Sequence, residues 1–130
     1  CPNLDTHEDT TSFEGFDKFP GHMRNKWCIV KIPPTASEKL VDKIVDCGYN
    51  TIHASNTLPT ELGGLSGKVL VPYTTRLIQY IKSKHPHVQI IAGGGVKNKS
   101  DAEQYLEAGA DHISLGTVCF TPWKVKSILK

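Results

Sequence analysis

Three glycine-containing groups in this chain could bind an anion. They are GGLSGK at residues 63–68, GGG at residues 93–95 and GT at residues 116–117. Each group follows a predicted strand or precedes a predicted helix, where unpaired backbone N–H groups and the helix dipole favour negative charge. Glycine also lets the main chain approach a ligand closely and adopt positive φ. Although any one group could simply mark a turn, the three together predict a site for an anion such as a phosphate.

Two polar side chains near predicted strand ends could act beside such an anion. Lys31 closes an otherwise apolar strand, from which its charge could stabilise a developing negative charge. The alternative is a lysine that merely extends from a strand end to solvent. Asn56 follows the next strand and offers a donor and an acceptor on one amide, which suits a planar heterocycle or a carboxylate. Its alternative is a residue of an Asx turn.

The cysteines and histidines show no pattern typical of a metal site. The four cysteines are scattered without a C-x-x-C pair, and the six histidines show no ligand spacing with carboxylates, so we predict no metal. Cys28 and Cys47 fall in apolar segments, as small core residues do. Cys1 could be a nucleophile or a base because the pKa of a thiol is adjustable, but the residues alone give it no role.

The composition is typical of an ordinary globular domain. Of the 130 residues, 38% are hydrophobic and 22% are charged, which is enough for a single core. A net charge of +2 without a basic block argues against a nucleic-acid partner. No apolar run approaches the ~18 residues that a membrane-spanning helix needs. Because the chain opens on Cys1 and not on methionine, we expect a segment of a longer protein.

The candidate residues lie among alternating predicted strands and helices. Residues 1–26 are polar and form a predicted active-site loop region, and residues 55–68 form a second polar loop. Short apolar runs predict strands at 27–32, 51–54, 88–92 and 112–115. Capping boxes predict helix starts at Thr35 and Ser100, and glycines predict the ends of these helices at Gly48 and Gly109. Prolines predict two more starts, with these apolar faces: Tyr73, Leu77, Ile78 and Ile81 after Pro72, and Val125, Ile128 and Leu129 after Pro122.

This order predicts four β/α units with parallel strands, because a parallel connection needs a crossover helix. The strands are near-continuous apolar runs, as expected when both faces are covered. We therefore predict that residues 1–130 form a single domain, the C-terminal half of a (β/α)8 barrel, with the four units in residues 27–130. A small open doubly wound sheet is the alternative. Isolated units would leave two sheet edges unpaired, so the chain alone should dimerise, aggregate or bind its ligand weakly.

The chain resembles the dihydroorotate dehydrogenases, which are FMN-dependent (β/α)8 barrels of pyrimidine biosynthesis. The resemblance runs through CPN, VKIPP, SNT, GGLSGK, IIAGGGV, the AEQYLEAGAD helix and ISLGT. GGLSGK together with the downstream glycine groups is its most specific part, whereas CPN alone would be weak. The resemblance implies oxidation of dihydroorotate to orotate, in which a base removes a proton and hydride passes to N5 of FMN.

The resemblance also implies a role for each motif residue. Cys1 matches the active-site base, which is cysteine in the soluble members and serine in the membrane-linked ones. Asn3 and Asn56 would bind the substrate, and Lys31 would lie against the flavin and stabilise its reduced, anionic ring. The other implied cofactor-binding residues are Ser55, Ser66, Gly67, Gly94, Gly95, Gly116 and Thr117.

Several alternatives stay open within this resemblance. The electron acceptor could be a quinone, fumarate or NAD, and the partners would be the remaining half of the barrel or a second copy in a homodimer. The cysteine base suggests a cytoplasmic protein, whereas GGLSGK is closer to mitochondrial or membrane-associated members with an upstream anchor. Other functions are an FMN barrel acting on pyrimidines, such as a dihydropyrimidine dehydrogenase or a dihydrouridine synthase, or a non-catalytic remnant that binds phosphate or flavin. Against the synthase, the sequence shows no basic surface for RNA.

Overall fold

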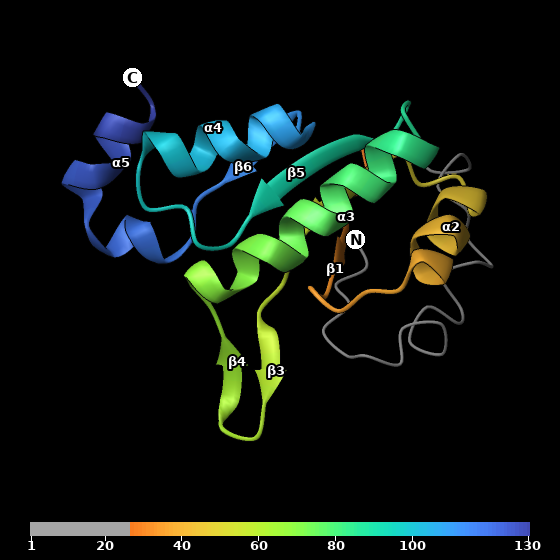
Figure 1. Ribbon diagram of the computed structural model, residues 1–130, viewed down its shortest axis with the longest axis horizontal. Helices are drawn as coiled ribbons and strands as arrows, with labels where there is room; N and C mark the ends of the chain where they lie inside the picture. Colours follow the sequence, from red (N-terminus) through yellow and green to blue (C-terminus); the bar gives the residue numbers. More distant parts are fainter. Residues whose placement is uncertain (1–26) are drawn as a thin grey trace.

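The computed structural model describes residues 27–130, which form a four-stranded parallel sheet with its crossover helices (Figure 1). The strands are β1 (Val30–Ile32), β2 (Thr51–Ala54), β5 (Gln89–Gly93) and β6 (His112–Ser114), in the order β1-β2-β5-β6. The α-helices are α2 (Glu38–Asp46), α3 (Val71–Lys84), α4 (Lys99–Ala108) and α5 (Pro122–Ile128). Two 3-10 turns, η2 (Lys68–Leu70) and η3 (Thr117–Phe120), precede α3 and α5. The predicted alternation of parallel strands and helices is confirmed; the predicted loop at 1–26 lies outside the described residues.

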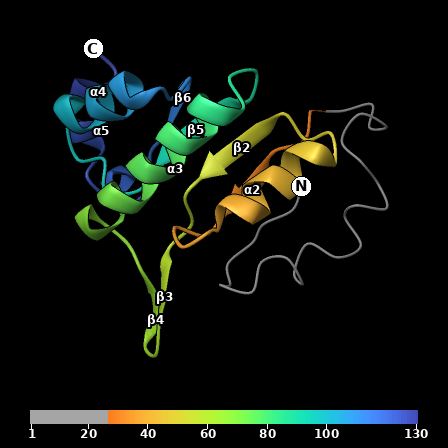
Figure 2. The same cartoon turned by 45° about the vertical axis from the view of Figure 1, so that its right-hand side comes forward.

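The two faces of the sheet differ in chemistry because successive strand residues point to opposite faces. One face is packed against the helices, with α3 against β2 and β5 and α4 against β6 (Figure 2). Its side chains are fully buried: Val30, Ile32, Ile52, Ala54, Ile90 and Ala92. The opposite face carries Lys31 and His53, which are partners in the register of β1 and β2. Within residues 27–130, the core side chains of the sheet therefore lie on its helix-covered face.

Two helices begin at caps other than the predicted ones. Thr35 lies in the turn that follows the two prolines, and Ser37 caps α2 by accepting a hydrogen bond from a backbone N–H at 3.1 Å. Asn98 caps α4 in the same way at 2.9 Å, so the helix already includes Ser100. Both actual caps have extended backbone, which is the conformation of an N-cap residue. The predicted end of α4 at Gly109 is confirmed, with φ of +118°.

The predicted apolar helix faces are buried except for two exposed residues and one partly buried one. The buried members are Leu77, Ile78 and Ile81 of α3 and Ile128 of α5, and Val125 of α5 is partly buried against the core. Tyr73 is 36% exposed, whereas the neighbouring Thr74 is 0% exposed. The buried stripe of a helix recurs every three or four residues, and Thr74 precedes the buried Leu77 and Ile78 by these intervals. Leu129 is 76% exposed because it follows the last helical residue of α5.

A β-hairpin occupies part of the segment that was predicted as a polar loop. Strand β3 (Leu58–Thr60) pairs antiparallel with β4 (Gly63–Leu65), and the hairpin extends away from the sheet and helices in both views (Figures 1 and 2). At its turn Thr60 Oγ1 donates a hydrogen bond to Gly63 O at 2.6 Å, and Gly63 adopts a φ of +121°. The prediction of a polar loop is therefore wrong for residues 58–65, which include the two paired strands.

A cluster of polar side chains joins α2 to α3. The Asp42 carboxylate accepts hydrogen bonds from Tyr80 Oη at 2.9 Å, Lys84 Nζ at 3.0 Å and His85 Nε2 at 2.7 Å. Burial by itself raises the pKa of Asp42, but the hydrogen bonds from His85, Lys84 and Tyr80 outweigh it and lower that pKa from 3.8 to about 2. Asp42 is therefore ionised and held in place at neutral pH.

We expect Asp42→Asn to lower the free energy of unfolding at pH 7 by about 1–2 kcal/mol, because charge-assisted hydrogen bonds become neutral ones. A carboxylate whose pKa is lowered in the folded state contributes stability above its unfolded pKa, and that contribution is lost as pH falls through the folded pKa. The difference between wild type and variant should thus be constant above about pH 5 and vanish towards about pH 2. Urea unfolding across this range measures it, with the exposed Asp46→Asn as control. A difference independent of pH would contradict the assignment.

Candidate functional site

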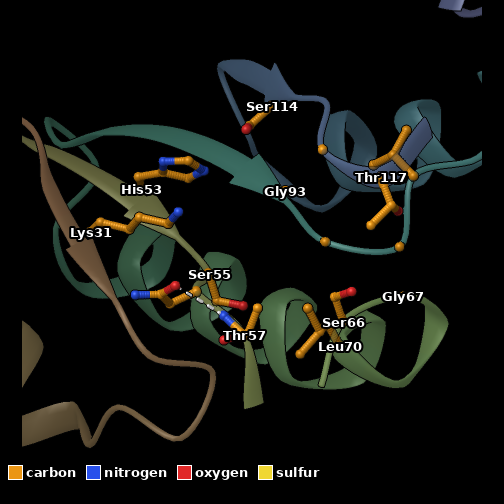
Figure 3. Close-up of a pocket in the computed structure, with 15 residues that line it drawn as sticks. Lys31, His53, Ser55, Thr57, Ser66, Gly67, Leu70, Gly93, Ser114 and Thr117 are labelled. Atoms are coloured by element: carbon orange, nitrogen blue, oxygen red, sulfur yellow. Dashed lines mark hydrogen bonds between the residues drawn. The ribbon is translucent and has the colours of Figure 1, made fainter. Parts of the chain in front are cut away.

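A pocket of about 230 Å³ lies at the carboxyl ends of the strands (Figure 3). Its walls come from all four strands of the sheet and from the loops before η2, after β5 and before η3. Every predicted site residue that the structure describes lines this pocket: Lys31, Ser55, Asn56, Ser66, Gly67, Gly94, Gly95, Gly116 and Thr117. The remaining predicted residues, Cys1 and Asn3, lie outside the described residues. The fold thus brings together side chains from opposite ends of the sequence.

Main-chain hydrogen bonds hold the strand ends around the pocket. Asn56 N donates to Ile32 O at 2.8 Å, and Ser55 N donates to Gly93 O at 3.3 Å. These two bonds extend the β1–β2 and β2–β5 pairings beyond the last regular residues of β2. The positions of Ser55 and Asn56 are therefore fixed by the sheet and do not depend on a mobile loop.

Lys31 places a positive charge in the pocket. Its neighbours Val30 and Ile32 are fully buried on the helix side, so the alternation of the strand directs Lys31 to the opposite face. Figure 3 shows its ammonium extending from β1 towards the middle of the pocket. Within residues 27–130, no carboxylate forms an ion pair with Lys31. An unpaired ammonium in a pocket of this kind suits a ligand that carries or develops negative charge.

The buried Thr74 of α3 supports the pocket through hydrogen bonds, a role that was not predicted from the sequence. Its buried hydroxyl donates a hydrogen bond to Gly93 O at 3.3 Å and lies 2.9 Å from Ser55 Oγ. With the Thr74 proton directed to Gly93, the Ser55 hydroxyl is the donor in the second bond. This arrangement orients the Ser55 side chain and leaves its oxygen with a lone pair for a ligand.

We expect Thr74→Val to lower the free energy of unfolding by about 1–3 kcal/mol, because Ser55 loses its buried partner and Gly93 loses one of its donors. The substitution preserves the shape of the side chain, so packing changes little. Urea unfolding measures the effect, and Thr75→Val, whose hydroxyl takes part in neither bond, is the matched control. If both valine variants were equally stable, the hydrogen-bond network would have no energetic importance.

Glycine is required where two loops of the pocket meet. Gly95 has a φ of +77°, and a Cβ there would lie 2.8 Å from Gly67 O. Gly94 has a φ of +102°, and its Cβ would lie 2.8 Å from Leu70 Cδ1. At Gly67 and Gly116, in contrast, a Cβ would meet nothing within 4 Å, so bare main chain borders open space. Exposed main chain of this kind is typical of backbone sites for anions.

The structure corrects the predicted use of GGLSGK. Ser66 and Gly67 line the pocket, but Gly63 and Gly64 belong to β4 of the hairpin. The glycine groups are also followed by the short η2 and η3 turns, or, in the case of Gly95, by two residues before the cap of α4. Backbone N–H groups are therefore the available anion ligands at these glycines. η2 runs directly into α3 at Val71, so a helix start follows Gly67 as predicted, whereas no helix begins directly after Gly95.

His53 also lines the pocket, and the sequence analysis did not select it. Burial is the main cause that lowers its pKa from 6.5 to about 4, and the positive charge of Lys31 lowers it further. The imidazole is therefore neutral at pH 7. The available signal was the alternation of β2, because residue 53 shares a face with Ser55 two residues later. The other lining residues not selected are Thr57, Leu70, Val96 and Ser114, whereas Gly93 belongs to the glycine group that was predicted.

Residues 27–130 contain no group of three or more histidine, cysteine, aspartate or glutamate side chains that could hold a metal ion. The helices in this part of the chain are also too short or too polar for any of them to cross a membrane.

Comparison with known proteins identifies the relatives of the chain. The family model described as dihydroorotate dehydrogenase matches residues 18–130. The dihydroorotate dehydrogenase B (NAD(+)) catalytic subunit of Desulforamulus reducens is 36% identical over 119 residues, covering 78% of this chain and 39% of that protein. The dihydroorotate dehydrogenase (quinone) of Dichelobacter nodosus is 33% identical, with 78% and 35% covered. The inosine-5'-monophosphate dehydrogenase of Caenorhabditis elegans is 33% identical over 91 residues, with 65% and 15% covered.

A solved structure shows the same fold. The crystal structure of ligand-free DHODH from Eimeria tenella superposes with a TM-score of 0.68 at 25% identity, covering 82% of this chain and 34% of that one. This chain thus spans less than two-fifths of the length of each of these relatives. The predicted fold, part of a (β/α)8 barrel, is confirmed. The family model matches nearly the whole chain, and the chain therefore belongs to the dihydroorotate dehydrogenase family.

Proposed function

We propose that the protein containing this chain oxidises dihydroorotate to orotate, and that residues 27–130 form a large part of its FMN site. The observation that carries the proposal is the pocket itself. In it the ammonium of Lys31, which forms no ion pair with any residue of 27–130, and the bare main chain of Gly67 and Gly116 face the same space. The family to which the chain belongs supports dihydroorotate as the substrate. The pocket supports a ligand that has an anionic group at one end and a planar, polar ring at the other.

The residues of the pocket fit both the phosphate and the ring of FMN. The main chain at Gly67, Gly94, Gly95 and Gly116 suits the phosphate, and Lys31 suits the polar edge of the ring. The inosine-5'-monophosphate dehydrogenase relative, whose name includes a nucleotide phosphate, supports a ligand of this class. The volume of about 230 Å³ is below the ~300–1,000 Å³ of typical ligand pockets. Residues outside the described range would therefore complete the enclosure.

FMN, when bound, supplies the hydride acceptor of the reaction. Lys31 would hold its positive charge against the ring, where it favours the reduced and more negative form. Asn56 would orient the substrate through its amide, and Ser55, held by Thr74, would hydrogen-bond the cofactor. Cys1 would take the proton from the substrate as its thiolate, with Asn3 as a second substrate ligand. The roles of Cys1 and Asn3 rest on the sequence resemblance.

The proposal concerns the half-reaction at the pocket, which precedes electron transfer to the acceptor. The relatives described above include one protein named for NAD(+) and one named for quinone. We propose that the electron acceptor of this protein is NAD(+), a quinone or fumarate. The remaining half of the barrel is the expected partner of this chain.

The visible absorption spectrum of the full-length protein tests the proposal, recorded without oxygen before and after dihydroorotate is added. We expect flavin bands that bleach with this substrate. Subsequent addition of NAD(+), a quinone or fumarate identifies the acceptor as the compound that restores the bands. A flavin spectrum that dihydroorotate leaves unchanged would favour another FMN barrel acting on pyrimidines. A protein without flavin that binds no added FMN would favour a non-catalytic remnant.

A further inference from the structure

His53 is a half-buried pocket residue whose imidazole makes no hydrogen bond to any group among residues 27–130. It lies on β2 in register with Lys31 on β1, and Figure 3 shows the two side chains next to each other at the wall of the pocket. A polar group that is partly removed from water without a partner carries a free-energy cost. Both ring nitrogens of His53 are therefore available to a ligand in the pocket.

We propose that His53 is a positioning residue for the flavin, whose neutral imidazole hydrogen-bonds the polar edge of the ring that Lys31 approaches. The inference rests on the FMN site proposed above. Along this row of the sheet the next residue in register is Ile91 on β5, which offers no hydrogen bond from its side chain. Across β1, β2 and β5, Lys31 and His53 are thus two neighbouring polar residues, followed by the apolar Ile91. A neutral imidazole has one donor and one acceptor, so it matches either an N–H or a carbonyl of a planar ring.

The neutral state of His53 follows from its surroundings. Burial, as the larger cause, and the nearby charge of Lys31 hold its pKa at about 4. Lys31 on β1 is the charged group beside the ring. Ile91 on β5, next to His53 in register, and Ser55, which follows β2 and lines the same pocket, are uncharged. The pair therefore presents one positive charge and one neutral hydrogen-bonding group, without repulsion between like charges. The imidazole of His53 therefore adds no charge to the site across the physiological pH range.

FMN binding by the full-length protein tests the positioning role with two variants. His53→Leu removes the hydrogen bond at similar volume, whereas His53→Gln keeps a donor and an acceptor. We expect His53→Leu to raise the Kd for FMN by about five- to tenfold, the loss of one hydrogen bond, and to shift the visible absorption maxima of bound FMN. His53→Gln should stay within about twofold of wild type and keep its spectrum.

Three outcomes would overturn the inference. If His53→Leu binds FMN with the wild-type Kd and spectrum, His53 does not contact the flavin. If both variants lose affinity equally, the residue acts by packing and not by hydrogen bonding. If the wild type binds no FMN, the proposed function fails and the inference fails with it, which is distinct from the first two results.

Nuclear magnetic resonance of histidine-labelled protein tests the charge state independently of activity. The Cε1–H signal of His53, assigned by its absence in His53→Gln, should stay constant between about pH 7.5 and 5.5. In Lys31→Gln its midpoint should rise, because one of the two causes of the lowered pKa is removed. A wild-type midpoint near 6.5, the ordinary value for histidine, would overturn the assignment of a neutral imidazole.

Discussion

Lys31→Met is expected to slow the reduction of bound flavin by dihydroorotate about 10²- to 10³-fold, the cost of removing one group that stabilises developing charge. The ammonium faces the pocket and has no carboxylate partner within residues 27–130, so its charge is available to the reacting ring. Methionine keeps the length of the side chain and removes the charge. Because the charge matters most for the reduced ring, the rate of reduction should fall more than the affinity for oxidised FMN.

Anaerobic stopped-flow absorbance at the flavin band measures this rate in the full-length protein saturated with FMN. Lys39→Met is the matched control, because Lys39 is an exposed residue of α2 and does not line the pocket. Equal rates in the Lys31 variant and wild type would exclude Lys31 from the chemistry. An equal loss in the Lys39 variant would indicate a nonspecific effect of the substitution.

Gly95→Ala is expected to lower the free energy of unfolding by about 2–4 kcal/mol and to abolish tight FMN binding. Alanine at a φ of +77° is strained, and its Cβ would lie 2.8 Å from the carbonyl oxygen of Gly67. Since the obstructing atom belongs to the main chain, no side-chain rotation can relieve the contact. The two loops would have to separate, and the main-chain N–H groups that they offer would move apart.

Thermal unfolding and FMN titration measure the two effects separately. Gly67→Ala is the control for stability, because Gly67 also has a positive φ, +98°, but a Cβ there would meet nothing within 4 Å. It should lose only the roughly 1–2 kcal/mol of strain that alanine incurs at positive φ. If Gly95→Ala were as stable as Gly67→Ala, the close approach of the two loops would not be essential to the fold.

The regular elements were predictable because their apolar patterns are local. Thr51–Ala54 is a short apolar run between polar segments, and it became β2 with the expected bounds. The hairpin of β3 and β4 was not predictable in this way. It contains Pro59 and two glycines and lacks the alternation of apolar and polar residues that indicates a strand. Its formation depends on pairing between two weak segments, which single-residue preferences do not reveal.

The pocket residues also differ in whether the sequence alone could indicate them. Gly95 was selected from the sequence because glycine signals main-chain freedom wherever it occurs. His53 and Thr74 were not, since a single polar residue in an apolar strand or helix resembles an ordinary neighbour of the core. Their positions became informative once the register placed His53 beside Lys31 and the packing of α3 placed Thr74 under Ser55. Such relations arise between elements and are not encoded in either element alone.

The strict division of the sheet into a helix-covered face and a pocket face has an evolutionary consequence. Residues 30, 32, 52 and 54 determine whether the helices pack, whereas residues 31, 53 and 55 determine what a ligand meets. A mutation at one of the second set alters recognition without removing any contact of the hydrophobic core. Natural selection could therefore exchange one ligand for another on this scaffold at every second strand position, while the architecture is inherited unchanged.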